Sequence, residues 1–259
     1  MKYKKICIFF LSFIHMAYGT AFAWEYIGHV EAVQTVQIRP EINARITKVH
    51  FNEGAFVNKS ANLFTLNTAQ FLAEVSLKKA ELSHANAVLE GASKYFSRLK
   101  ATDKRGVIAS DLDAAESEVK QAKAAVEEAK ANLRLAEIQL GYTKITSPFA
   151  GRVGKINFHQ GSYVSPENIL CEIVQLKPMR VLFVMPDRDY LIFRDNPQNF
   201  KYELFLADGS PYSGTVEKDF EDNVMNPDTG TINIWLKVSN ENNILLPGAL
   251  VRVKVISGE

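Results

Sequence analysis

Hydrophobic residues recur every seven positions through the middle of the chain. Between residues 111 and 141 two such series interleave, one of leucine and valine and one of alanine: Leu112, Val119, Val126, Leu133, Leu140 and Ala115, Ala122, Ala129, Ala136. The preceding segment repeats this spacing: Val75, Leu82, Leu89, Phe96 and Lys78, Ala85, Ala92, Leu99. A sustained a/d pattern predicts helices that pack along one seam. Residues 68–141 are therefore predicted to form two long helices.

Capping and turn residues divide this region into two halves. Asn67 or Thr68 can cap the first helix and Ser110 the second, because their side-chain oxygens accept hydrogen bonds from first-turn amides. Gly141 is placed to end the second helix. The turn signal at residues 104–106 lies midway, so the helices are predicted to run antiparallel with their tip at about 101–110. A parallel coiled-coil dimer is the less favoured alternative.

The segments on either side of the helices resemble each other. Residues 42–66 and 145–175 share the order short strand, glycine, apolar alternation, polar turn and apolar strand, with Gly54 and Gly161 at equivalent places. Each segment holds four short strands, too few to close a core alone. Together they are predicted to form one β-sandwich that the helical hairpin interrupts.

From residue 177 onward, alternating apolar positions are separated by turn residues. Strands are expected at 179–185, 201–206, 213–221, 231–238 and 249–256. Closely spaced antiparallel strands without a long helix between them predict a small β-barrel. The predicted fold class is therefore α+β and mostly β: a split sandwich, a long antiparallel helical hairpin and a small antiparallel barrel.

The amino terminus has the pattern of an export signal. Three lysines within residues 2–5 precede a mostly apolar core at residues 6–16, and residues 21–23 form an A-x-A-like cleavage site. The mature chain would begin at Trp24, or the segment would remain as an uncleaved anchor. The predicted boundaries are a signal peptide at 1–23, a lead strand and first half-motif at 24–67, the hairpin at 68–141, the second half-motif at 142–176 and the barrel at 177–259.

Charge and composition exclude several function classes. The formal net charge is +1, which gives no electrostatic basis for binding nucleic acid. Five scattered histidines form no metal-binding motif, and neither a nucleophile elbow nor a phosphate-binding loop occurs. Asp219, Glu221 and Asp222 are interpreted as a polar turn face. We therefore expect no catalytic residue, no metal and no cofactor, and a protein that is not an enzyme.

Three separated motifs carry a family resemblance. Residues 143–154 (TKITSPFAGRVG) are similar to a T-x-I-x-A-P-F-x-G-x-V-G return strand, with Ser147 in place of alanine. Residues 226–232 (NPDTGTI) and 246–253 (LPGALVRV) are similar to a barrel turn and a closing strand. In this order they resemble the periplasmic adaptor proteins (membrane fusion, HlyD-like family) of tripartite efflux pumps, more closely those serving resistance-nodulation-division (RND) transporters. The resemblance covers essentially residues 27–256.

The resemblance implies a function in assembly. It implies a lipoyl-like sandwich and a periplasmic protein at the inner-membrane face, linking an RND transporter to a TolC-like outer-membrane channel and self-associating into a trimeric or hexameric ring. Family members usually carry a membrane-proximal domain, which is expected here to be absent or vestigial. The alternatives are an envelope coiled-coil scaffold or an adaptor of an ABC or major-facilitator exporter. A lipoyl or biotinyl carrier is less favoured, because the hairpin replaces the turn that would bear the modified lysine.

The resemblance also points to site residues at the hairpin tip. Family adaptors dock on the channel through an arginine, a leucine and a serine, and their spacing falls on Arg98, Thr102 and Ala109. Leu99 lies three residues before the Thr102 position, and Ser110 lies one residue after Ala109. The expected structural turns contain glycines and prolines that need positive φ, close approach or a fixed φ: Gly54, Gly151, Gly161, Pro227, Gly230, Pro247 and Gly248.

Overall fold

The computed structural model describes residues 23–101, 109–195 and 199–257. The chain divides into two compact units. The central unit is Gln34–Leu176, and the terminal unit combines Met1–Val33 with Lys177–Glu259. Thr102 lies outside the described residues.

The central unit contains two four-stranded sheets. One has the order β2-β9-β7-β4 and the other β6-β5-β3-β8. The bounds are β2 Thr35–Ile38, β3 Ala44–Val49, β4 Phe56–Val57, β5 Asn62–Leu66, β6 Lys144–Thr146, β7 Gly151–Val153, β8 Tyr163–Val164 and β9 Cys171–Val174. Each sequence half supplies four strands, and both sheets mix strands from the two halves.

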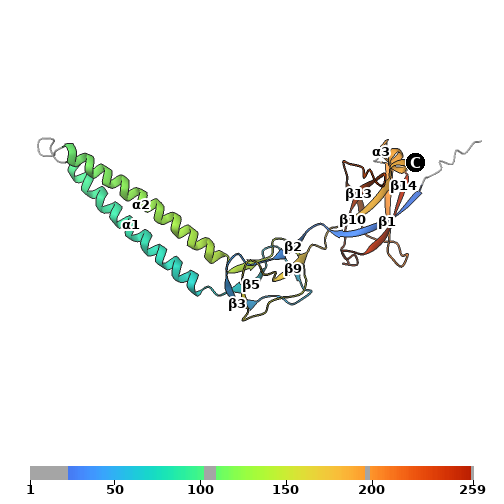
Figure 1. The fold of residues 1–259 in the computed structure, drawn as a ribbon, viewed down its shortest axis with the longest axis horizontal. Helices are drawn as coiled ribbons and strands as arrows, with labels where there is room; N and C mark the ends of the chain where they lie inside the picture. Colours follow the sequence, from blue (N-terminus) through green and yellow to red (C-terminus); the bar gives the residue numbers. More distant parts are fainter. Residues whose placement is uncertain (1–22, 102–108, 196–198, 258–259) are drawn as a thin grey trace, which may run out of the picture. The chain divides into compact units, whose positions relative to one another are not determined.

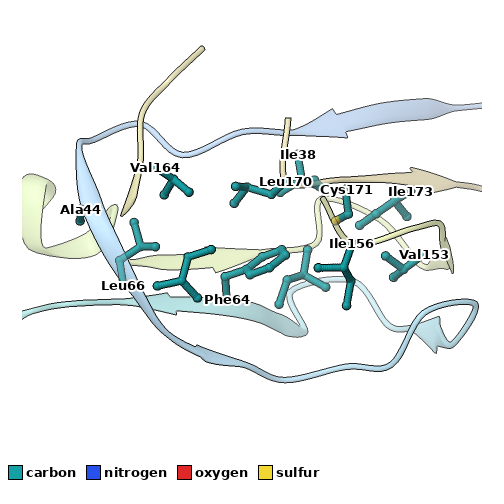
Figure 2. Packing of buried hydrophobic residues seen from close by; sticks show 12 residues of the cluster. Ile38, Ala44, Phe64, Leu66, Val153, Ile156, Val164, Leu170, Cys171 and Ile173 are labelled. Carbon is teal, nitrogen blue, oxygen red and sulfur yellow. The ribbon is translucent and has the colours of Figure 1, made fainter. Parts of the chain in front are cut away.

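Strands pair within each half, β3 with β5 and β7 with β9, and also between the two halves. Strand β3 pairs with β8, and the equivalent pairing joins β7 to β4. The sheets enclose a core of large apolar side chains, among them Phe64, Leu66, Leu170 and Ile173 (Figure 2). Since each half covers the other half's apolar face, neither can bury its core alone.

Two glycines occupy equivalent turns in the two halves. Gly54 has φ +74° and Gly161 φ +94°, in the left-handed region where a side chain is costly. Gly151 is required for a different reason, because a Cβ atom there would lie 2.6 Å from the carbonyl oxygen of Val174. In the terminal unit Gly230 and Gly248 also have positive φ.

Two helices of 33 residues each, α1 (Ala69–Ala101) and α2 (Ala109–Gly141), leave and rejoin the sandwich (Figure 1). The side chain of Asn67 accepts a hydrogen bond from the amide of Ala69 at 3.0 Å, which caps α1. Ser110 lies inside the first turn of α2 instead of preceding it. At their base the flanking strands β5 and β6 pair antiparallel, with Phe64 opposite Ile145.

The terminal unit is built on one six-stranded antiparallel sheet of order β11-β14-β1-β10-β13-β12. Its bounds are β1 Ala23–Ala32, β10 Met179–Pro186, β11 Phe200–Phe205, β12 Val216–Glu221, β13 Thr231–Val238 and β14 Leu250–Ser257. The lead strand β1 thus lies at the centre of this sheet, between β10 and β14. The sequence analysis had grouped it with the first half-motif, because adjacency along the chain does not reveal long-range pairing.

A short helix, α3 (Asp187–Asp195), follows β10 and was not expected. It buries Phe193, whose ring lies 5.0 Å from that of Phe200. The sheet differs from the expected closed barrel in one respect. Among the described strands, β11 and β12 are its two edges and do not pair with each other.

Candidate functional site

Burial along the helix pair follows the heptads. The alanine series of α2 is buried throughout at Ala115, Ala122, Ala129 and Ala136. On α1 the two seam series are buried or half-buried, and Val75 and Ala92 are buried. Small side chains at every second layer of the seam allow the two helix axes to approach closely. The rest of the surface of both helices lies outside the seam and is exposed.

One flank of α2 is densely charged. Lys120 pairs with Glu116 at 2.6 Å, and Lys130 pairs with Glu127 at 2.8 Å. The hydrogen bond from each lysine lowers the pKa of its partner glutamate below the ordinary value. Such exposed pairs add little to helix stability, because water and salt screen the two charges. They maintain a solvated surface over this part of the hairpin.

Elsewhere on the helices, large apolar side chains face solvent. Leu77, Val88 and Tyr95 of α1 are about half exposed, as is Leu135 of α2. None of the four belongs to the heptad seam. Single exposed apolar side chains are common on protein surfaces, and here they remain accessible to another molecule.

The predicted tip residues separate into two kinds. Arg98 is exposed in the last turn of α1, where a cation is also favourable for the helix dipole. Leu99 is half-buried in the seam. Ala109 and Ser110 are exposed at the start of α2. The structure therefore places three exposed residues at the tip end of the helices, and assigns Leu99 to packing.

An aromatic cluster that the sequence analysis missed lies on the outer face of the terminal unit. Phe220 and Trp235 stack with their centroids 4.3 Å apart, and the Arg180 guanidinium lies 5.2 Å from the Phe220 ring. Asp219 pairs with Arg180 at 2.7 Å, and the Trp235 indole donates to Glu31 at 3.2 Å. Alternation along β13 marks Trp235 as outward-facing, but the bulge after Lys218 sets the register that stacks it on Phe220, and neither strand alone reveals that register. Ordered tryptophan and arginine side chains are common at protein interfaces.

The acidic residues 219, 221 and 222 each have a different partner. Glu221 pairs with Lys218 at 2.6 Å and accepts from the Tyr190 hydroxyl at 3.2 Å, whereas Asp222 accepts from the Asn233 amide at 3.4 Å. Within residues 23–257 as described, no group of histidine, cysteine, aspartate and glutamate side chains could hold a metal ion.

Two buried groups with shifted pKa values serve packing. Burial raises the pKa of the Cys171 thiol to about 12, which leaves it protonated in the sandwich core. Burial and a hydrogen bond to Asp189 raise the pKa of Tyr26 well above its ordinary range. That bond, 3.0 Å long, fastens α3 to β1. No helix in the described part of the chain is both long and apolar enough to cross a bilayer.

Comparison with known families identifies the class of protein. Residues 34–175, more than half of the chain, match the family model described as the barrel-sandwich hybrid domain of RND membrane fusion proteins (MFP). These residues coincide with the split sandwich and the helix pair of the central unit. The chain belongs to the RND membrane fusion protein family.

Curated relatives align over most of the chain. The multidrug efflux pump subunit AcrA of Escherichia coli (strain K12) is 30% identical over 248 residues, which cover 90% of this chain and 62% of AcrA. The efflux pump periplasmic linker BepF of Brucella suis biovar 1 (strain 1330) is 31% identical over 240 residues, covering 90% of this chain and 58% of BepF. The chain thus spans roughly three fifths of the length of these two relatives.

Solved structures share the fold. MacA from Actinobacillus actinomycetemcomitans superposes with a TM-score of 0.70 at 17% identity, covering 92% of this chain and 80% of MacA. The membrane fusion protein Spr0693 from Streptococcus pneumoniae R6 gives a TM-score of 0.70 at 15% identity, covering 91% of this chain and all of the other. At these identities the likeness establishes the fold alone.

Proposed function

We propose that this protein is a non-enzymatic periplasmic adaptor that links an inner-membrane RND transporter to an outer-membrane channel. The observation that carries the proposal is the pair of 33-residue helices inserted into a barrel-sandwich hybrid domain of the RND family. At 1.5 Å per residue each helix reaches about 50 Å from the sandwich. The names of AcrA and BepF, an efflux pump subunit and a periplasmic linker, support the same function.

In this proposal the two units have different partners. Arg98, Ala109 and Ser110 at the tip end contact the channel, together with Thr102, which is not among the described residues. The aromatic cluster around Trp235 contacts the transporter. Exposed apolar residues on the helix flanks, such as Val88 and Tyr95, pack between neighbouring copies, so that a trimeric or hexameric ring encloses the export route. An amino-terminal signal, cleaved before Trp24 or retained as an anchor, delivers the chain to the periplasm.

Photo-crosslinking in living cells tests the channel contact. A photoreactive amino acid is placed at Ser110, and at Glu128 as the matched control, since both are exposed on α2 but only Ser110 lies near the tip. We expect an adduct with an outer-membrane channel protein from position 110 and none from position 128. Channel adducts from both positions, or only self-adducts from an exported and folded protein, would contradict the docking role of the tip.

A sensitivity assay tests the function as a whole. Cells that express the RND transporter and channel but lack this protein should become more sensitive to at least one exported compound. Restoring the protein should restore resistance. Unchanged resistance across a panel of compounds would favour the scaffold alternative.

A further inference from the structure

The two edges of the six-stranded sheet approach each other without pairing. Strand β11 pairs only with β14 and strand β12 only with β13. The Cα atoms of the two edge strands nevertheless come within 8 Å of each other, and residues 200–203 and 216–221 line one cleft. Since no main-chain ladder joins these two described strands, side-chain contacts must hold this seam of the barrel together.

Helix α3 contacts both edges at the seam. The ring of Phe193, which is fully buried, lies 5.0 Å from the ring of Phe200 on β11. The ammonium group of Lys218 on β12 lies 4.8 Å from the centre of the same Phe193 ring. Paired rings and a cation beside a ring attract each other. One side chain of α3 therefore links the first strand of the sheet to the last.

A hydrogen bond makes a second link between α3 and β12. The hydroxyl of Tyr190 donates to Glu221 at 3.2 Å. Burial and the nearby Glu221 carboxylate raise the pKa of Tyr190, so the hydroxyl keeps the proton that it donates. Glu221 also pairs with Lys218 at 2.6 Å, but both residues belong to β12, so this ion pair does not cross the seam.

The hydroxyl of Tyr202 on β11 does not provide a direct polar link across the seam. It is buried and has no hydrogen-bond partner among the described residues. Burial, and then the Glu221 carboxylate, raise the pKa of Tyr202, so this carboxylate lies within electrostatic range without accepting its proton. A buried hydroxyl without a partner is costly. Glu221 is thus bonded to α3 and not to the opposite edge.

Other bonds fix the start of α3 independently of the seam. The amide of Asp187 donates to the carbonyl of Gly230 at 2.9 Å. The hydroxyl of Tyr26 on β1 donates to the buried Asp189 at 3.0 Å. Both bonds involve the first turn of α3, whereas Phe193 lies in its last turn. The ring at the seam can therefore move while the helix stays attached to the sheet.

We propose that α3 is a strap that holds the barrel seam shut, and that withdrawal of Phe193 opens the seam between β11 and β12. Opening breaks side-chain contacts but no strand pair, because the described strands β11 and β12 share no main-chain bonds. It also gives the Tyr202 hydroxyl access to water, which offsets part of the cost. The proposal goes beyond the adaptor function and does not depend on it.

Hydrogen exchange of the purified full chain, followed by NMR, tests the strap. The reporters are the amides of Glu203 and Glu217, which by strand alternation bond to β14 and β13. The reference is the amide of Val181 in β10, a strand that is paired on both sides. Phe193→Leu removes the ring but keeps an apolar side chain. We expect it to speed exchange of both reporters roughly fivefold or more relative to the reference.

Two further variants make the test specific. Leu191→Ala is the matched control, because Leu191 is 46% exposed on the same helix, and it should leave both reporters unchanged. Tyr190→Phe removes the hydroxyl that bonds to Glu221. It should speed exchange at Glu217 roughly two- to tenfold, with little change at Glu203, because the Phe193 ring still contacts β11.

Three results would overturn the proposal. They are unchanged exchange at either reporter in Phe193→Leu, equal acceleration at the reporters and at Val181, and the same acceleration in Leu191→Ala. The second result would mean that Phe193 stabilises the whole sheet and not the seam. The third would mean that any shortened side chain on α3 has the effect.

Discussion

The sandwich and the helix pair of the central unit bury their surfaces in opposite ways. The sandwich core is made of large side chains such as Leu63, Phe64 and Ile173, all fully buried. The helix pair buries chiefly alanine along α2, while leucine and tyrosine side chains remain exposed on its flanks. Burying a large side chain contributes about 1.5–3 kcal/mol, far more than burying a methyl group.

This difference in buried side chains indicates that the sandwich and the helix pair have different roles within the central unit. The sandwich is stabilised by its own core and can hold the ends of the helices in place. The helix pair depends on intrinsic helix propensity and close backbone approach, and its remaining apolar surface is available to other proteins. Substitutions should therefore act differently in the two regions.

The largest expected effect comes from emptying the sandwich core. Phe64 is fully buried and packs edge-to-face on Phe51 at 5.3 Å. Phe64→Ala should lower the free energy of unfolding by about 3–5 kcal/mol, because it removes apolar contacts and leaves a cavity. Urea unfolding measures this, with Phe56→Ala at the 55% exposed Phe56 as the control. Equal losses in the two variants would contradict the assigned core.

An intermediate effect is expected from overfilling the alanine seam. Ala122→Leu should destabilise the helix pair by about 1–3 kcal/mol, because the larger side chain forces the two helices apart. Ala124→Leu is the matched control, since Ala124 is exposed on the same helix. Thermal melts followed by far-ultraviolet circular dichroism should separate the two variants. Identical melts would mean that the helices do not pack through this seam.

Glycine substitutions should have opposite signs in the two regions. Gly161→Ala should destabilise the protein by about 1–2 kcal/mol, since φ is +94° there. Gly91→Ala, in α1, should stabilise it by up to about 1 kcal/mol, because alanine favours helix and no atom lies within 4 Å of the added Cβ. Chemical denaturation of both variants tests this. A gain at Gly161 or a loss at Gly91 would contradict the assigned backbone conformations.

The smallest effect concerns pH and is confined to alkaline solution. Because the folded pKa of Cys171 is about 12, against 9.0 without burial, its stabilising contribution is complete below pH 9 and falls as pH rises toward 12. Ionisation of the thiol in the unfolded chain is the cause. Urea unfolding at a series of pH values should show a steeper alkaline decline for the native chain than for Cys171→Ala. Parallel curves would place the thiol in contact with water.

Local patterns predicted most of the central unit. The heptads predicted the packed faces of both helices, and the repeated glycine turns predicted two half-motifs. The second half-motif has the four expected strands, β6 to β9, whereas residues 42–66 hold three, because β2 lies upstream at Thr35–Ile38. Long-range features could not be predicted in this way. The pairing of β1 with β10 joins residues about 150 positions apart along the chain, and no local period records it. The nine-residue helix α3 is too short to establish a period and is fixed by the burial of Phe193.

The candidate sites also divide into features that follow from local sequence patterns and features that depend on long-range strand pairing. Exposure of Arg98 follows from its heptad position, and so does the packing role of Leu99. The Phe220–Trp235 stack depends on the register between β12 and β13, which is not encoded by residues that are near each other in the sequence.

Because β5 and β6 pair at the base of the two helices, the length of the helices can change without changing the sandwich. Because these strands lie side by side, the chain leaves β5 and returns to β6 about one strand spacing apart, roughly 4.8 Å, for any number of intervening heptads. Adding or deleting one heptad in both helices would change the reach by about 10 Å without altering any sheet register. The architecture thus allows evolution to change the reach of the helix pair by duplication or loss of seven-residue units.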